Sequence, residues 1–411
     1  MSTAPAKRIR DPRLDFFRGI GMFIIFIAHT PLNPLVRWIP ARFGFSDATE
    51  IFVFCSGMAS AIAFGAVFDR HGWLMGTARV LHRVWQVYWA QIIVFFVIAT
   101  MLMAIDQTGA FDKNFIDRLN LRPFFNDPGP NLVGLLTLTY VPNYFDILPM
   151  YIVILALMPL VMALARINTN YAIAASVLTW AAASQPWIAV LDVPIFQGLN
   201  LPAEPWSQRT WFFNPFAWQL VFFTGFAFMR GWLPPPPVRR DLILLCIAIV
   251  IIAIPLHYFV LLQAFPVLSE ARSAIAALVT KTYFGLFRYL HFLAVAYLAW
   301  VAAGEFGRNL PQHGWAGRVV ETVKQVGQQS LAVFLASLVI AQLCGVLLSA
   351  TDQHPLVVIG VNVFGALALV VVARVTAWFK SNPWKRPAPT AVVANQRVEP
   401  TTGSALAAPK I

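Results

Sequence analysis

The stretch RLDFFRGIGMFIIFIAHTPLNP (residues 13–34) reads as a membrane-spanning helix with two costly side chains in it. Arg18 lies near its front edge, and His29 follows eleven residues later, past an almost unbroken apolar run. About 20 consecutive apolar residues are enough to cross a bilayer. Because a charged or titratable residue in such a segment is expensive, the pair predicts a functional site.

The composition extends this interpretation to the whole chain. Of 411 residues, 59% are hydrophobic and 12% are charged, and the mean hydropathy is +0.68. An ordinary globular protein carries about 25% charged residues. The excess is spread along the sequence, which predicts an all-α polytopic membrane protein. The net charge of +12 does not point to nucleic acid, because the basic residues fall mostly between apolar runs.

Windows of about 20 residues give ten candidate transmembrane helices. They cover residues 15–35, 47–68, 80–105, 146–165, 170–190, 213–230, 241–262, 283–303, 329–349 and 356–379. Of the 30 Lys and Arg residues, 21 fall on the side that holds the N-terminus. The positive-inside rule therefore predicts that both termini are cytoplasmic.

Three regions follow from these windows. Residues 1–14 form a basic cytoplasmic segment, residues 15–380 the ten-span domain, and residues 381–411 a tail whose composition predicts disorder. Two outer loops, 106–145 and 191–212, are long and rich in Pro, Asn and Trp. Loops of that length are often functional.

The first predicted helix places its two polar residues on one face. Eleven residues at 100° each make three turns plus about 20°, so Arg18 and His29 share a stripe and lie about 16–17 Å apart along the axis. Arg18 would then lie near the inner headgroups and His29 beyond the midplane. The alternative is that Arg18 extends to inner phosphates and His29 serves only packing.

Two carboxylates open the second predicted helix, in the sequence SDATEIFVF. Asp47 and Glu50 are three residues apart and therefore on one face. Either could orient a nearby imidazole, as a carboxylate does for a catalytic histidine. The alternative for Asp47 is that it complements the helix N-terminus. Ser56, Gly57 and their small neighbours predict a close helix contact.

Basic residues gather at the predicted inner end of the third helix. Arg79 and Arg83 are four apart and point along one face, and with Arg18 they could form a cationic funnel for phosphates. Positive-inside anchoring would explain each of them singly.

The outer ends of later helices carry three further polar residues. Asp146 starts the fourth helix, where a carboxylate commonly caps the helix. Arg288 and His291 lie near the outer end of the eighth, and Arg288 could receive an acidic group or pair with Asp146 or Glu50. No spacing of Cys, His or carboxylates supports a metal site.

The blocks RLDFFRGIGMFIIFIAH, FGFSDATEIFVFCSGMASA, RVWQVYW and FDILPMYIVILALMPL resemble the OpgC family, which is related to the wider acyltransferase family three. The resemblance covers nearly all of residues 9–380. It implies a ten-span inner-membrane enzyme that succinylates osmoregulated periplasmic glucans. The wider family's Arg, ten residues and His correspond to Arg18 and His29, whereas Ser337 stands where a later family His would be.

The resemblance implies transfer from a cytoplasmic acyl-CoA, most simply succinyl-CoA, with no permanently bound cofactor. Arg18, Arg83 and Arg79 would hold the CoA phosphates, and His29 would act as general base with Glu50 or Asp47 orienting it. On the substrate side, Asp146 would bind the substrate at the outer face, and Trp206 and Trp211 would stack on sugar rings. Arg288 would receive a succinyl carboxylate. An acyl-histidine intermediate is a variant of this scheme.

Two alternative functions fit parts of the sequence. One is acetylation of another surface polysaccharide by the same chemistry. The other is a glycan or lipid transporter, in which buried charges line a pathway. Against the transporter stand the lack of an inverted repeat in the sequence and an arginine cluster that faces a single deep histidine.

Overall fold

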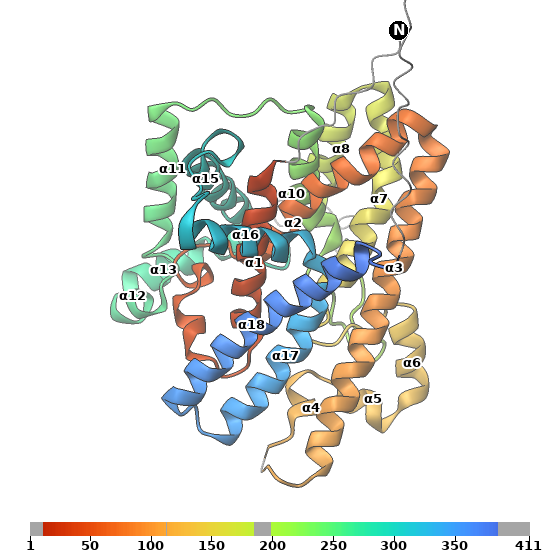
Figure 1. Ribbon diagram of the computed structural model, residues 1–411, viewed down its shortest axis with the longest axis vertical. Coiled ribbons are helices and arrows are strands. Elements are labelled where there is room, and N and C mark those ends of the chain that lie inside the picture. The colour runs from red at the N-terminus through yellow and green to blue at the C-terminus, as the bar shows by residue number, and fades with distance from the viewer. Residues whose placement is uncertain (1–10, 112, 185–198, 385–411) are drawn as a thin grey trace, which may run out of the picture.

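Helices make up the fold (Figure 1). The computed structural model describes residues 11–111, 113–184 and 199–384. Within these ranges the only extended pairing is an isolated bridge between Pro202 and Thr210. The first half of the described chain contains α1 (Pro12–His29), α2 (Ala48–Ser60), α3 (Ala66–Gln107), α4 (Phe115–Arg118), α5 (Arg122–Asn126), α6 (Pro128–Leu136), α7 (Ile147–Ile167) and α8 (Thr169–Ala183).

The second half continues in the same way. It contains α10 (Pro215–Arg230), α11 (Arg240–Ala253), α12 (Phe259–Ala264), α13 (Pro266–Ala274), α14 (Ala276–Val279), α15 (Leu286–Ala303), α16 (Gly314–Gln328), α17 (Ser330–Ala350) and α18 (Pro355–Lys380). Short helical turns η1 (Pro34–Trp38) and η2 (Pro40–Arg42) follow α1, and η5 (Glu305–Gly307) follows α15.

Several helices are long and apolar enough to cross a bilayer, which confirms the prediction of an all-helical membrane protein. In the part of the chain that the structure describes, five segments meet this criterion: Ala48–Gln107, Ile147–Ile167, Leu286–Ala303, Ser330–Ala350 and Pro355–Lys380. Helices α8, α10 and α11 are shorter, with 15, 16 and 14 residues. Helix α1 carries three charged residues. The count of ten spans and the side of the termini therefore stay predictions.

The segment Ala48–Gln107 holds two of the predicted spans, 47–68 and 80–105. A π-helical turn, η3 (Ala61–Gly65), joins α2 to α3. Within α3 the helix breaks at Gly72, whose φ of 79° lies in the left-handed region that glycine adopts at little cost. The break separates the two predicted spans.

Helix α1 lies near the middle of the molecule, and α16 crosses it (Figure 1). Asp11 caps its start by accepting a hydrogen bond from the Arg13 amide, and Pro12 occupies the first turn. The crossing with α16 is close because Gly19 abuts the Val323 backbone. A side chain at this glycine would force the two helices apart.

Helices α2 and α10 also approach closely. Gly57 of α2 abuts the backbone of Phe222, and Gly225 of α10 abuts the backbone of Phe54. This contact confirms the close helix approach predicted for the small residues around Ser56 and Gly57. The segments after α3, namely α4, α5 and α6, gather at the lower end of the molecule in Figure 1.

Some predicted regions lie outside the described residues. These are residues 1–10 of the basic N-terminal segment, 185–190 of the fifth predicted span, 191–198 of the second outer loop and 385–411 of the tail.

Candidate active site

His29 is the last residue of α1, and its ring is held by the helix's own backbone. Its Nδ1 lies 2.8 Å from the carbonyl oxygen of Ile25. A carbonyl can only accept, so the proton sits on Nδ1 and Nε2 carries the lone pair. The side chain is half-buried. This arrangement presents Nε2 as a base.

Tyr144 packs against the His29 ring. The two ring centroids are 5.1 Å apart at an interplanar angle of 74°. Tyr144 comes from the loop before α7 and has a φ of 86°, which a non-glycine residue adopts at a cost. Its hydroxyl donates to the carbonyl of Leu338 on α17 at 2.7 Å. Contacts with α1 and α17 therefore hold a strained residue at this point.

Helix α17 also passes close to the end of α1. Gly345 packs against Pro31, two residues after His29. Gln342, one turn after Leu338, is 5% exposed. Ser337, on the same helix, donates its hydroxyl to the Phe334 carbonyl at 2.7 Å and is buried.

Asp47 forms the entry to α2 and pairs with a lysine that the sequence did not single out. Asp47 Oδ1 accepts from the Thr49 amide, and Glu50 Oε2 accepts from the Asp47 amide, each at 2.7 Å, which is a capping box. Asp47 Oδ2 lies 2.5 Å from Lys281 Nζ. Lys281 precedes α15 in the sequence, so this ion pair links the start of α2 to the region before α15.

Glu50 and Arg288 form a buried ion pair at 2.7 Å. Glu50 is 0% exposed and Arg288 is 6% exposed. Of the two partners considered for Arg288, the structure therefore confirms Glu50 and not Asp146. A second buried contact lies beside it, where His291 Nδ1 is 2.8 Å from Ser46 Oγ.

We expected Glu50 or Asp47 to orient the His29 ring through a hydrogen bond. The structure pairs these three residues differently. Each carboxylate is engaged by a cation, and the imidazole is held by Ile25. The physical reason is that a buried carboxylate gains more from a guanidinium or ammonium than from a neutral ring N–H. The Ile25 carbonyl is within reach because it lies one turn before His29 on the same helix, and a carbonyl oxygen has two lone pairs, so it can accept a second hydrogen bond.

Basic residues do converge at the junction of α16 and α17. Arg18 Nη2 donates to Ser330 Oγ at 2.5 Å, and Lys380 Nζ donates to Gln329 Oε1 at 2.6 Å. The structure thus brings Arg18 to this junction and adds Lys380, which sequence reasoning missed. Arg83 donates to Gln86 Oε1 on its own helix at 3.1 Å. Arg79 is exposed one turn earlier on α3.

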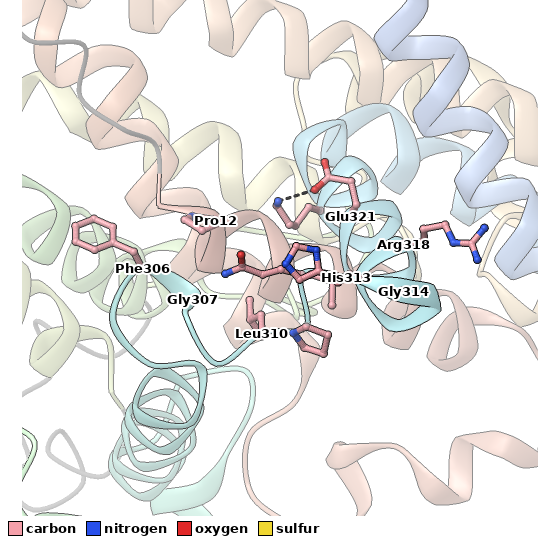
Figure 2. Close-up of a pocket in the computed structure, with 13 residues that line it drawn as sticks. Pro12, Phe306, Gly307, Leu310, His313, Gly314, Arg318 and Glu321 are labelled. Carbon is pink, nitrogen blue, oxygen red and sulfur yellow. Dashed lines mark hydrogen bonds and ion pairs between the residues drawn. The ribbon is translucent and has the colours of Figure 1, made fainter.

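A separate cavity of about 740 Å³ lies where α1 begins (Figure 2). Pro12, Gly307, His313 and Arg318 contribute to its lining. Lys324 and Glu321 at its edge form an ion pair at 2.6 Å, drawn as the dashed line in Figure 2. Because Pro12 and His29 are the two ends of α1, about 25 Å of helix separates this cavity from the imidazole.

The predicted substrate residues of the outer loops differ in exposure. Trp211 is 2% exposed, and its indole N–H donates to the Pro202 carbonyl at 2.9 Å. Trp206 is 47% exposed, and its ring lies 5.5 Å from that of Tyr140. Asp146 is buried directly before α7. Of the two tryptophans, Trp206 is therefore the one that presents an open face.

Tyr144, Gln342, Lys281 and Lys380 are the additional polar residues of these sites. The sequence carried a signal for Lys281 and Gln342, because each is a polar side chain in an otherwise apolar stretch. Within the described ranges, no group of three or more His, Cys, Asp or Glu side chains could hold a metal ion.

The fold and the site define a helical membrane protein with an oriented histidine at the end of α1, a buried ion pair between α2 and α15, and a cationic helix junction beside Arg18. The family model described as OpgC protein matches residues 10–381, so the chain belongs to the OpgC family. This membership indicates an acyltransferase activity. No curated protein and no solved structure matches the chain.

Proposed function

We propose that the protein is an inner-membrane O-acyltransferase that moves a succinyl group from cytoplasmic succinyl-CoA onto hydroxyls of a periplasmic glucan. Its membership of the OpgC family supports the reaction class. The observation that carries the assignment of His29 is the hydrogen bond from its Nδ1 to Ile25, which leaves Nε2 as the base.

The chemistry follows from that tautomer. His29 Nε2 takes the proton of the glucan hydroxyl while the hydroxyl oxygen attacks the thioester carbonyl carbon. The new C–O bond forms and the C–S bond breaks. The CoA thiolate then leaves and takes up the proton from the imidazolium, so the histidine returns to its starting state.

The cationic junction supplies a place for the donor. Arg18, Arg83 and Lys380 would bind the CoA phosphates, with Arg79 at the exposed edge, because guanidinium and ammonium groups form strong charge-assisted hydrogen bonds to phosphate. Arg18 and His29 are about 16–17 Å apart along α1, and an extended pantetheine arm can cover that length. Acyl-CoA is a co-substrate here and not a resident cofactor.

The acceptor would approach from the opposite end of α1. The loop of residues 199–214 carries the exposed Trp206, whose ring can stack on a sugar, and Asp146 is buried directly before α7. Arg288 is held by Glu50, so a succinyl carboxylate would have to displace that buried partner to reach it.

The test is His29→Ala in detergent-purified protein supplied with succinyl-CoA and glucan. Losing a general base costs about 10²–10⁴ in rate. We expect CoA release and glucan succinylation to fall at least 100-fold, while thermal unfolding stays near that of the wild type. The matched control is His354→Ala, which changes an exposed histidine before α18 and should leave both rates unchanged. Transfer retained by His29→Ala would contradict the assignment.

A further inference from the structure

Gln342 is a buried amide with an unsatisfied donor. Its side chain is 5% exposed, and its amide nitrogen meets no acceptor in hydrogen-bonding geometry within the described residues. Burying such a group costs folding free energy unless it is used elsewhere. Most buried polar groups are satisfied, so this one requires an explanation.

The position of Gln342 on α17 places it beside the candidate base. Leu338, Gln342 and Gly345 are spaced by four and three residues, so they lie on one face of the helix. Leu338 accepts the hydroxyl of Tyr144, whose ring contacts His29. Gln342 therefore lies on the face of α17 that lines the His29 site.

Two contacts of this face show where α17 passes α1. Gly345 abuts Pro31, which follows His29 by two residues, so α17 passes the end of α1 at this point. The Gln342 side chain also lies beside the Tyr144 hydroxyl. An amide nitrogen carries two N–H groups, and a single hydroxyl oxygen at that position can satisfy only one of them.

We propose that Gln342 donates a hydrogen bond to the acyl carbonyl oxygen as negative charge develops on it. This inference rests on the proposed acyl transfer and names a further residue for it. When the glucan oxygen attacks, the carbonyl π electrons move onto the carbonyl oxygen, which becomes an oxyanion. When the C–S bond breaks, those electrons re-form the carbonyl.

The second N–H group of Gln342, which the Tyr144 hydroxyl cannot satisfy, is held in place and suits this task. It needs no reorganisation at the moment of reaction, and its interaction is stronger away from water. The cost of leaving the donor unpaired in the folded protein is then offset in the transition state. Tyr144, whose hydroxyl is directed to Leu338, acts as a positioning residue for the ring and the amide.

The experiment replaces the amide by an apolar group of similar size, Gln342→Leu, in full-length purified protein. Removing one oxyanion donor typically costs about 10²–10³ in kcat. We expect kcat for succinyl transfer to fall about 100-fold, with the KM for succinyl-CoA within threefold of the wild type. We also expect the thermal midpoint to be unchanged or higher, because the substitution removes a buried donor that lacks a partner.

The matched control is Gln219→Leu. Gln219 is 2% exposed, and its amide makes two hydrogen bonds to Ser176, at 2.6 and 2.7 Å. This variant should lower the thermal midpoint while leaving kcat per folded molecule near the wild-type value. The two glutamines thus predict opposite patterns of stability and activity.

Each other result has a definite meaning. If Gln342→Leu keeps kcat within threefold, or loses kcat together with its thermal midpoint as a structural residue would, the inference is overturned and the proposed function stands. If the wild-type protein is no faster than His29→Ala, the proposed function fails and this inference fails with it.

Discussion

The Glu50–Arg288 cluster joins the beginnings of α2 and α15, and the His29 cluster lies at the end of α1. These two polar clusters differ in how completely their groups are paired. In the Glu50–Arg288 cluster, the carboxylate accepts from a guanidinium and from a backbone amide. In the His29 cluster, the imidazole has one engaged nitrogen and the neighbouring Gln342 amide nitrogen lacks an acceptor. Complete pairing is typical of structural groups, and incomplete pairing leaves groups available to a substrate.

The comparison predicts that Glu50 contributes to stability more than to chemistry. Glu50→Gln keeps an acceptor for the Asp47 amide but leaves Arg288 buried without an anion. Removing one partner of a buried ion pair costs about 3–5 kcal/mol. We expect a loss of that size in the free energy of unfolding, measured by denaturant titration in detergent.

Two further variants make this test specific. Asp69→Asn breaks the exposed Asp69–Arg230 pair, which is 2.8 Å long, and should cost less than about 1 kcal/mol. The double variant Glu50→Gln/Arg288→Gln should recover part of the loss, because no charge is left unpaired. A Glu50→Gln protein with wild-type stability and a 100-fold lower kcat would assign Glu50 to the chemistry instead.

The next largest effect concerns the cationic junction. Lys380→Met removes one cation from the group that includes Arg18 and Arg83. A hydrogen bond to a charged group contributes about 1.5–3 kcal/mol, so the KM for succinyl-CoA should rise at least tenfold with little change in kcat. Steady-state kinetics at varied succinyl-CoA would measure both parameters.

The control for this variant is Lys324→Met. Lys324 is paired with Glu321 at the edge of the cavity in Figure 2 and is not part of the junction. Its KM for succinyl-CoA should equal that of the wild type. The reverse outcome, with KM raised by Lys324→Met and not by Lys380→Met, would move the nucleotide to that cavity.

The sequence was informative where the pattern is local. The stripe of Arg18 and His29 follows from helix geometry, and the alternative given for Asp47, a place at a helix N-terminus, agrees with its position as the N-cap of α2. The part that Glu50 plays in that capping box was not predicted. The partner of Arg288 could be reduced to two carboxylates. All of these predictions depend on residues within one helix or on a scarcity of buried charge, and both are visible in a single sequence.

The rest depends on contacts between distant segments. Tyr144 reaches His29 only because a residue with a φ of 86° turns its ring toward α1, and no local pattern predicts that conformation. Gln342 becomes notable only when the fold shows that its buried amide nitrogen has an N–H group without an acceptor. Lys281 meets Asp47 across 234 residues of sequence, and Lys380 meets Gln329 across 51.

The smallest predicted effect compares the two tryptophans of the outer loop. Trp206 is exposed and Trp211 is buried, so the same substitution should have different consequences. Trp206→Ala should raise the KM for glucan by about two- to tenfold, because an aromatic contact contributes about 0.5–1.5 kcal/mol. Stability should not change, since the side chain is 47% exposed.

Trp211→Ala is the matched variant. It removes a buried ring and its hydrogen bond to Pro202, and deleting a buried tryptophan costs about 3–5 kcal/mol in the free energy of unfolding. Glucan titrations and thermal unfolding of both variants would separate binding from folding. If Trp206→Ala leaves the glucan KM unchanged, the exposed ring does not contact the acceptor, and the acceptor must enter beside Asp146 without it.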